Sequence, residues 1–303
     1  MNEGRARVSI GMPVYNGVRF LKEAIESILA QTFEDFELII SDNASIDQTE
    51  QICREYAAKD KRIRYYRNEK NLGAARNYNR VFELSTGEYF KWQAHDDLCD
   101  PQFLEKGVAV LARDPSIVLC YSKFLRIDEH GNPLTMETSK VRGGAKPHER
   151  FRSVIQYRDT CEEIFGLMRS SVLRKTHLIG NYSNSDDKLL AELALHGCFY
   201  EVPEPLIMYR IHPGQSTRMY SNRLDRMAWF DPSAAGHIAF PFFRQFFEYL
   251  SLIRRSALPW PESLRCYLHV CGWLWKFRHR LRGDLSAVIF YRTIAPVLKR
   301  HAP

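Results

Sequence analysis

The first 125 residues alternate between two hydrophobic patterns, and this alternation constrains the fold more than any other feature of the chain. Short apolar runs predict strands, and the stretches between them carry apolar residues at helical spacing. The predicted strands cover residues 8–12, 36–40, 63–66, 88–92 and 117–124, and the predicted helices cover 18–30, 47–58, 74–84 and 101–112. Strands that alternate with helices of this length are typical of an α/β fold with a mostly parallel sheet.

Two of these helices carry a local start signal. Asp47 is a candidate N-cap of the second helix, because Glu50 follows three residues later. Pro101 suits the first position of the fourth helix, where its missing N–H costs nothing.

The pattern changes twice beyond Phe124. The stretch 126–158 is polar and contains several glycines, so we interpret it as a loop excursion. A helix over 186–195 and strands over 199–202 and 206–209 follow, and two long aromatic and basic segments, 239–253 and 262–281, predict helices. We therefore expect one domain over 1–220, with halves of about 1–125 and 126–220, and a helical, basic C-terminal extension over 221–303.

The charge of the chain is unevenly distributed. The 303 residues carry a net charge of +7, and residues 254–303 hold ten Lys or Arg against two Asp or Glu. No stretch has the roughly 18 apolar residues that a membrane-spanning helix needs, and the N-terminus lacks a signal-peptide pattern. The seven cysteines form no CxxC pair, which argues against a disulfide framework or a thiolate zinc site. Together these features predict a cytoplasmic protein.

Acidic residues follow two of the predicted strands directly. Asp42 comes after the second strand, and Asp96 and Asp97 come after the fourth. Because the carboxyl ends of parallel strands meet at one edge of a sheet, these carboxylates are expected in one crevice. Such a cluster suits a hard divalent cation with a phosphate ligand, although each residue alone also fits an N-cap, an Asx-turn or a solvated turn. The sequence contains neither GxxxxGK[ST] nor GxGxxG, so a glycine-rich phosphate loop is not expected.

Several segments stand in a recognisable order and spacing: residues 8–16, 31–33, 37–49, 71–77, 87–89, 95–97 with Pro101, and 204–206 with Tyr209, Arg210 and His212. In this order and spacing they resemble the family-2 glycosyltransferases, which have the GT-A fold of nucleotide-diphospho-sugar transferases. The resemblance covers about residues 6–217 and leaves out the C-terminal extension.

The resemblance implies a nucleotide-sugar site in the first half of the chain. Pro13, Tyr15 and Asn16 match the first nucleotide-contacting loop, and Asp42 matches the carboxylate that binds the pyrimidine. Arg76 matches a basic residue near the phosphates. UDP is the nucleotide that Asp42 favours, and a dTDP donor presents the same edge.

The resemblance also implies a metal site for Mn²⁺ or Mg²⁺. Asp96 matches the metal-binding end of the family's DxD motif, and His95 lies between it and Ala94, which replaces the first Asp. His212 matches a histidine that reaches the metal or the diphosphate in some relatives, and a plain loop histidine is the alternative.

The catalytic base is expected at the start of the helix near residue 186. Asp186 fits the family pattern best, and the adjacent Asp187 is the second candidate. These residues imply an inverting, metal-dependent transfer of a sugar to a glycan or lipid-linked hydroxyl acceptor, in the synthesis of a surface polysaccharide or glycolipid. The rival interpretations are a sugar-phosphate nucleotidyltransferase and a non-catalytic sugar-nucleotide or glycan-binding module.

The segment 262–282 interleaves aromatic residues with Arg and Lys. This composition suits peripheral contact with the inner face of a membrane, and it equally suits a helix that packs on the first domain or on a second subunit. A homo-oligomer is compatible with the sequence. No nucleic-acid-binding module is recognisable, so no nucleic acid partner is expected.

Overall fold

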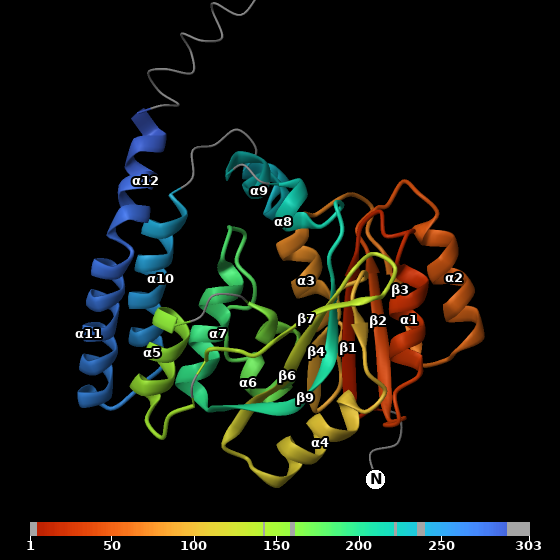
Figure 1. Ribbon diagram of the computed structural model, residues 1–303, viewed down its shortest axis with the longest axis horizontal. Coiled ribbons are helices and arrows are strands. Elements are labelled where there is room, and N and C mark those ends of the chain that lie inside the picture. Colours follow the sequence, from red (N-terminus) through yellow and green to blue (C-terminus); the bar gives the residue numbers. More distant parts are fainter. Residues whose placement is uncertain (1–4, 142, 158–160, 221–222, 235–239, 290–303) are drawn as a thin grey trace, which may run out of the picture.

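The computed structural model describes residues 5–141, 143–157, 161–220, 223–234 and 240–289, and within them a sheet of nine strands forms the centre of the fold (Figure 1). The first four strands are parallel, in the spatial order β3 (Ile63–Arg67), β2 (Phe36–Asp42), β1 (Val8–Val14) and β4 (Tyr89–Trp92). Every residue of β1 and β2 is buried, which explains their nearly continuous apolar sequences.

The first four helices flank the sheet, as predicted. They are α1 (Leu21–Leu29), α2 (Thr49–Lys59), α3 (Ala74–Glu83) and α4 (Phe103–Arg113), of which α4 packs against the second half of the sheet. Two predicted starts are wrong. Gln48 is the N-cap of α2, one residue after the predicted position, although the Asp47 carboxylate still accepts from the Thr49 N–H at the helix start and from the Val18 N–H. Pro101 precedes α4, whose N-cap is Gln102.

The second half of the sheet is mixed. The order continues from β4 through β8 (Leu167–Arg169), β6 (Ile117–Ile127) and β9 (Cys198–Arg210) to β5 (Leu98–Cys99), and β7 (Pro133–Glu137) pairs with β6. The two strands predicted over 199–202 and 206–209 are one strand, β9. Its prolines, Pro203 and Pro205, are accommodated because the pairing of β9 with β6 shifts register beside them.

The stretch 126–158 is not a plain loop. It contains β7, reached through a turn in which Gly131 has a φ of 85°, and α5 (Pro147–Tyr157). Helix α5 buries Phe151, Val154 and Ile155 and packs against α7 (Ser185–His196) and the C-terminal helix α11 (Trp260–Lys276). The helix was not predicted because the stretch is mostly polar, and because its few apolar residues pack against helices that come much later in the chain. Arg158 lies outside the described residues.

The second half of the chain also contains short elements. Between α5 and α7 lie η1 (Glu162–Phe165) and α6 (Ser170–Leu173), and between β9 and α10 lie α8 (Ser216–Met219), α9 (Arg223–Phe230) and η2 (Pro232–Ala234). Helices α8 and α9 were not predicted, and Figure 1 shows them beyond the start of α3. Gly73, the N-cap of α3, lies close to the end of α9. A Cβ added to Gly73 would lie 2.6 Å from the carbonyl oxygen of Phe230.

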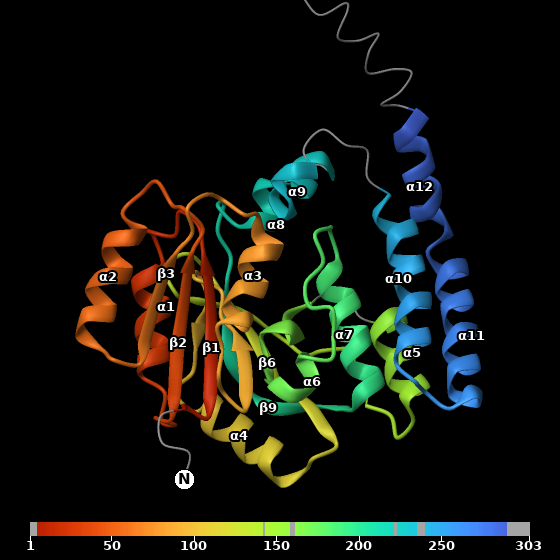
Figure 2. The same ribbon diagram turned by 180° about the vertical axis from the view of Figure 1, so that it is seen from behind.

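The C-terminal helices lie side by side in Figures 1 and 2. They are α10 (Pro241–Arg255), α11 and α12 (Arg278–Ile289); the predicted start of the first, Ala239, lies outside the described residues. The single helix predicted over 262–281 is two helices, because Phe277 leaves helical geometry with φ −100° and ψ 15°. Tyr249, Val270 and Trp273 join the same apolar core as the sheet. Among the helices that the structure describes, none has the length and apolar character needed to cross a membrane.

Candidate active site

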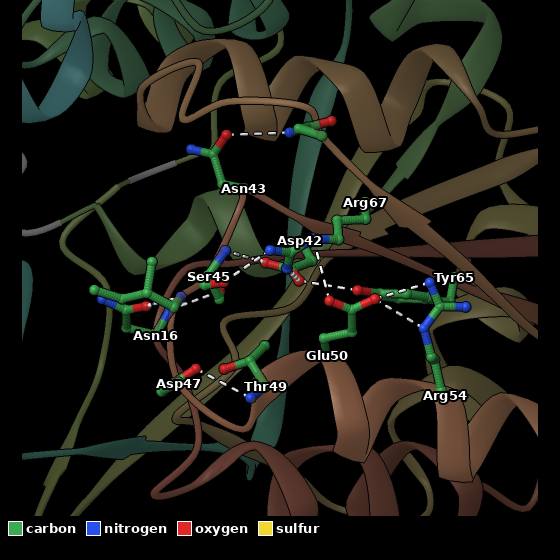
Figure 3. Close-up of polar contacts among 12 residues, drawn as sticks. Asn16, Asp42, Asn43, Ser45, Asp47, Thr49, Glu50, Arg54, Tyr65 and Arg67 are labelled. Atoms are coloured by element: carbon green, nitrogen blue, oxygen red, sulfur yellow. Dashed lines mark hydrogen bonds and ion pairs between the residues drawn. The ribbon is translucent and has the colours of Figure 1, made fainter.

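The loops that follow β1 and β2 are tied together at the carboxyl edge of the sheet (Figure 3). The backbone N–H of Asn16 donates to Ser45 Oγ over 2.9 Å, and its side-chain Oδ1 accepts from the Ile46 N–H over 3.0 Å. The Gly17 N–H donates to Thr49 Oγ1 over 2.9 Å. Asn16 adopts a φ of 51°, which asparagine tolerates better than most residues. This predicted site residue therefore holds the shape of the loop.

Asp42 ends β2 and is fully buried. Its Oδ1 accepts from the Ser45 N–H over 2.8 Å, and its Oδ2 accepts from Tyr65 Oη over 2.9 Å and from Arg67 over 2.7 Å. The Arg67 side chain is one-third exposed, and Figure 3 shows it between Asp42 and Glu50. Both oxygens of the Asp42 carboxylate therefore already accept hydrogen bonds from the protein.

The remaining residues of the expected nucleotide loop lie at the same edge. Pro13 is the penultimate residue of β1. The pairing of β1 with β4 ends at Gly11, so the missing N–H of Pro13 removes no hydrogen bond to β4. Tyr15 follows the strand and is 39% exposed. Arg76 is exposed in the first turn of α3. Hydrogen bonds from Ser233 lower the pKa of Asp231, and the charge of Arg76 lowers it further.

Asp96 and His212 meet across the site. Asp96 follows β4 and His212 follows β9, and His212 Nε2 lies 3.0 Å from Asp96 Oδ2. Burial opposes ionisation of Asp96, but the charge of His95 and the hydrogen bond and charge of His212 keep its pKa below the usual value. The ring of His95 packs against Gly17, where an added Cβ would lie 2.7 Å from the imidazole. The ends of β1, β4 and β9 are thus joined at one place.

Asp97 is buried and hydrogen-bonded to the backbone of β9. Its Oδ1 accepts from the Arg210 N–H over 2.9 Å, and burial together with the negative charge of Asp96 raises its pKa well above the usual value. One oxygen of the Asp97 carboxylate is therefore engaged by the fold, whereas Asp96 contacts His212.

Arg210 is the residue whose importance the sequence did not reveal. It is completely buried, and it donates to the carbonyl oxygens of Asp96 and Glu129, each over 3.0 Å. It also reaches the Glu23 carboxylate over 2.6 Å and stacks on the ring of Phe20. The only signal in the sequence was its place beside Tyr209 and His212. We infer that Arg210 positions the Asp96 loop.

Asp186 and Asp187 lie in the first turn of α7. The Asp187 N–H donates to Asp186 Oδ1 over 3.0 Å, and the Asp187 carboxylate lies 3.4 Å from the side-chain nitrogen of Gln245 on α10. Ligand atoms of Cys161, Asp186 and Asp187 all lie within 4.8 Å of one another. Asp187 is therefore directed toward the C-terminal helices.

Tyr78 lies on α3, and nothing in the sequence pointed to it. Burial is the main cause that raises its pKa, and the charges of Asp96, Asp97 and Asp186 raise it further.

Comparisons with known proteins agree with this arrangement. Residues 9–175 match the model of the family described as glycosyl transferase family 2. An uncharacterized glycosyltransferase of Haemophilus influenzae is 29% identical over 233 residues, which cover 73% of this chain and 70% of that protein.

Two solved structures share the fold. Staphylococcus aureus TarS 1–349 in complex with UDP-GlcNAc superposes with a TM-score of 0.69 at 15% identity, over 94% of this chain and 81% of that one. The mannosyltransferase PcManGT of Pyrobaculum calidifontis, in complex with GDP-Man and Mn²⁺, gives a TM-score of 0.53 at 15% identity, over 97% and 82% of the two chains. At this identity the likeness concerns the fold, and the GT-A architecture expected from the sequence is confirmed.

Proposed function

Because the chain belongs to glycosyltransferase family 2, we propose that it transfers a sugar from a nucleotide-diphosphate sugar, with UDP as the nucleotide, to an acceptor hydroxyl. The observation that carries this proposal is the contact between Asp96 and His212 at the carboxyl edge of the sheet, where His95 also packs against Gly17 in the loop after β1. The donor is assigned to the side of Asp96 and the acceptor to the side of Asp186.

The nucleotide is assigned to the loops after β1 and β2. Tyr15 is exposed beside a loop that Asn16 and Ser45 hold in place, so its ring is available to a base. Asp42 is assigned to the pyrimidine N–H, with Arg67 displaced from its Oδ2. Arg76 is exposed and cationic, and we assign it to the diphosphate. The complexes of TarS with UDP-GlcNAc and of PcManGT with GDP-Man support a nucleotide-sugar donor.

Asp96 and His212 are the residues that would hold a divalent cation. A carboxylate oxygen and an imidazole nitrogen 3.0 Å apart are a donor pair that suits Mn²⁺, and Mg²⁺ is the alternative. When bound, the cation would offset the negative charge of the diphosphate leaving group. The presence of Mn²⁺ in the PcManGT complex supports this assignment. Asp97 is not assigned as a ligand here, since its Oδ1 accepts from the Arg210 N–H.

Asp186 is assigned as the general base. It removes the proton from the acceptor hydroxyl, whose oxygen attacks the anomeric carbon opposite the leaving diphosphate. One such displacement inverts the anomeric configuration. Asp187 is less suited to this role because Gln245 draws its carboxylate toward α10. The acceptor is proposed to be a glycan or a lipid-linked hydroxyl compound of the kind used in surface polysaccharide or glycolipid synthesis.

The test is a donor-hydrolysis screen. Purified protein is incubated with Mn²⁺ or Mg²⁺ and a panel of UDP-, dTDP- and GDP-sugars, and release of the nucleoside diphosphate is measured. The proposal predicts slow, metal-dependent release from a UDP-sugar that is lost in both Asp96→Ala and Asp186→Asn. Binding of a UDP-sugar with no turnover in the presence of any acceptor would favour a non-catalytic binding module.

A further inference from the structure

A large pocket lies between the loop before α7 and the helices α9, α10 and α12. Its volume is about 840 Å³, which is within the range of sites that hold small organic ligands. Figure 1 shows α10 and α12 adjacent, with α9 near their upper ends. The polar residues of its lining are Tyr182, Arg244, Glu248, Ser251 and Arg255.

The pocket walls are apolar and aromatic. Phe240, Phe243, Phe247 and Leu285 all contribute to the lining. Phe247 is 61% exposed and Leu285 is 52% exposed, although each carries a large hydrophobic side chain. An apolar surface of this kind that continues into a cavity marks a binding site for an apolar group.

The wall formed by α12 is fixed to α10 by a buried carboxylate. Asp284 is fully buried, and its Oδ2 accepts from the backbone N–H groups of Phe242 and Phe243 at the start of α10, over 2.9 and 3.2 Å. A carboxylate at a helix N-terminus is stabilised by the helix dipole. Leu285, the next residue, is thereby held at the pocket, so the cavity is a built feature of the C-terminal helices.

The polar groups of the pocket select an anion. The Tyr182 side chain is 2% exposed, and its hydroxyl has no hydrogen-bond partner among the described residues. The guanidinium of Arg244 lies 4.1 Å from the centre of the same ring. Arg255 is a second cation in the lining, and Glu248 is its one acid. Arg244 also donates to Asn181 Oδ1 and Arg255 to Ser251 Oγ, one hydrogen bond each among the described residues, so both guanidinium groups keep further N–H donors. A lining with two such arginines and an orphaned tyrosine hydroxyl suits the oxygens of a phosphate group.

The pocket is connected to the proposed catalytic base. Tyr182 precedes Asp186 by four residues, in the segment that leads into α7. Gln245, adjacent to Arg244 on α10, contacts the Asp187 carboxylate. A ligand held in the pocket would therefore lie at the acceptor side of the site, away from Asp96.

We propose that this pocket binds an acceptor in which a hydrocarbon chain is joined through a phosphate group to the part that carries the acceptor hydroxyl. The chain lies along Phe243 and the other aromatic residues, and the phosphate lies by Tyr182, Arg244 and Arg255. This inference rests on the proposed function, because it names the class of acceptor that Asp186 serves. A free neutral glycan would offer no anion to the two arginines, and inorganic phosphate would leave the cavity largely empty.

The probe for the test is dodecyl phosphate below its critical micelle concentration, titrated calorimetrically into the full chain. Inorganic phosphate and dodecyl maltoside are titrated in parallel, since each carries only one half of the recognised chemistry. We expect one dodecyl phosphate to bind per chain, at least tenfold more tightly than either inorganic phosphate or dodecyl maltoside. Arg244→Gln should weaken it roughly tenfold, as expected for loss of a charge-assisted hydrogen bond. Ser251→Trp should block the cavity and abolish binding.

The matched control is Arg278→Gln, which removes an exposed arginine that stacks on Trp275 outside the pocket. It should leave the affinity unchanged. Equal losses in Arg244→Gln and Arg278→Gln, or binding only to phosphatidylglycerol vesicles, would overturn the proposal in favour of a basic membrane-binding surface. Thermal unfolding of each variant checks that it is folded.

A UDP titration on the same samples separates this inference from the function on which it rests. If UDP binds and dodecyl phosphate does not, the pocket assignment fails and the proposed transferase stands. If dodecyl phosphate binds as expected and UDP does not, the pocket assignment stands and the proposed donor site fails.

Discussion

His212 Nε2 lies 3.0 Å from Asp96 Oδ2, although the two residues are 116 positions apart in the chain. The contact joins the end of β9 to the end of β4, and the ring of Phe20 packs edge-on against His212 with 4.7 Å between ring centres. Arg210 stacks on the other side of this arrangement, 4.5 Å from the centre of the Phe20 ring. The proposed metal ligands are therefore held by packing and hydrogen bonds that involve three separate segments.

Arg210 should be essential for stability even though it is not proposed to contact a substrate. Arg210→Met leaves the buried carbonyl oxygens of Asp96 and Glu129 without their donor, so we expect a loss of about 3 kcal/mol in the free energy of unfolding. Urea unfolding measures this loss. The matched control is Arg19→Met, which removes an exposed arginine paired with the same Glu129. It should cost less than about 1 kcal/mol, and equal losses in both would contradict the positioning role of Arg210.

The two candidate bases should separate in kinetics. Asp186→Asn should lower turnover by roughly 10²–10⁴-fold, the usual contribution of a general base, without changing UDP affinity. Asp187→Asn keeps an amide that can still contact Gln245, so it should lower turnover far less. Steady-state assays with the donor found by the hydrolysis screen measure both. A larger loss in Asp187→Asn would transfer the role of base to Asp187.

Gly73 should tolerate no side chain. It has a φ of 84°, and an added Cβ would lie 2.6 Å from both the Phe230 carbonyl oxygen and Pro232. Gly131→Ala is the control, because Gly131 has a φ of 85° with nothing within 4 Å of the added Cβ. We expect Gly131→Ala to cost about 1 kcal/mol from backbone strain alone and Gly73→Ala to cost about 2 kcal/mol more. Thermal unfolding measures the loss of stability in each variant. Equal losses in Gly73→Ala and Gly131→Ala would mean that the contact between the end of α9 and the start of α3 adds no cost.

Glu37 should make the stability of the protein depend on pH. It is buried, and although burial opposes its ionisation, hydrogen bonds from Ser9, Arg64 and Thr86 lower its pKa. The unfolded chain therefore takes up a proton at a higher pH than the folded chain does. The stabilisation is complete above the unfolded pKa, about 4.3, and is lost as the pH falls through the folded value.

Urea unfolding of the wild type and Glu37→Gln measures this effect. The wild type should be more stable by about 1–2 kcal/mol at pH 7, and the difference should shrink between roughly pH 4.5 and pH 3. A difference that is constant over this range would show that the charge of Glu37 contributes nothing.

The elements that were predicted correctly are those whose signal is local. Strands β1 and β2 are fully buried, so their apolar runs identify them without knowledge of their neighbours. Helix α5 was missed because its apolar side is covered by α7 and α11, which come later in the chain. Strand β9 was divided in two because Pro203 and Pro205 suggest an end, whereas a register shift accommodates them.

The site shows the same division between local and distant information. The resemblance to family 2 pointed to Asp96 and His212, and the structure brings them into contact. It did not reveal that the Asp97 carboxylate accepts from the backbone N–H of Arg210. This hydrogen bond forms only because the fold places β9 beside the loop after β4. The role of Arg210 depends on Glu23, Asp96 and Glu129 meeting around one side chain, which no spacing in the sequence encodes.

The most direct test of the account is a calorimetric titration of UDP into the wild type and into Asp96→Asn, each with and without Mn²⁺. The account predicts that Mn²⁺ tightens UDP binding to the wild type at least tenfold and has little effect on Asp96→Asn. Asp114→Asn, which changes an exposed aspartate at the end of α4, should behave as the wild type does. Failure of UDP to bind the wild type under either condition would contradict the proposed donor site.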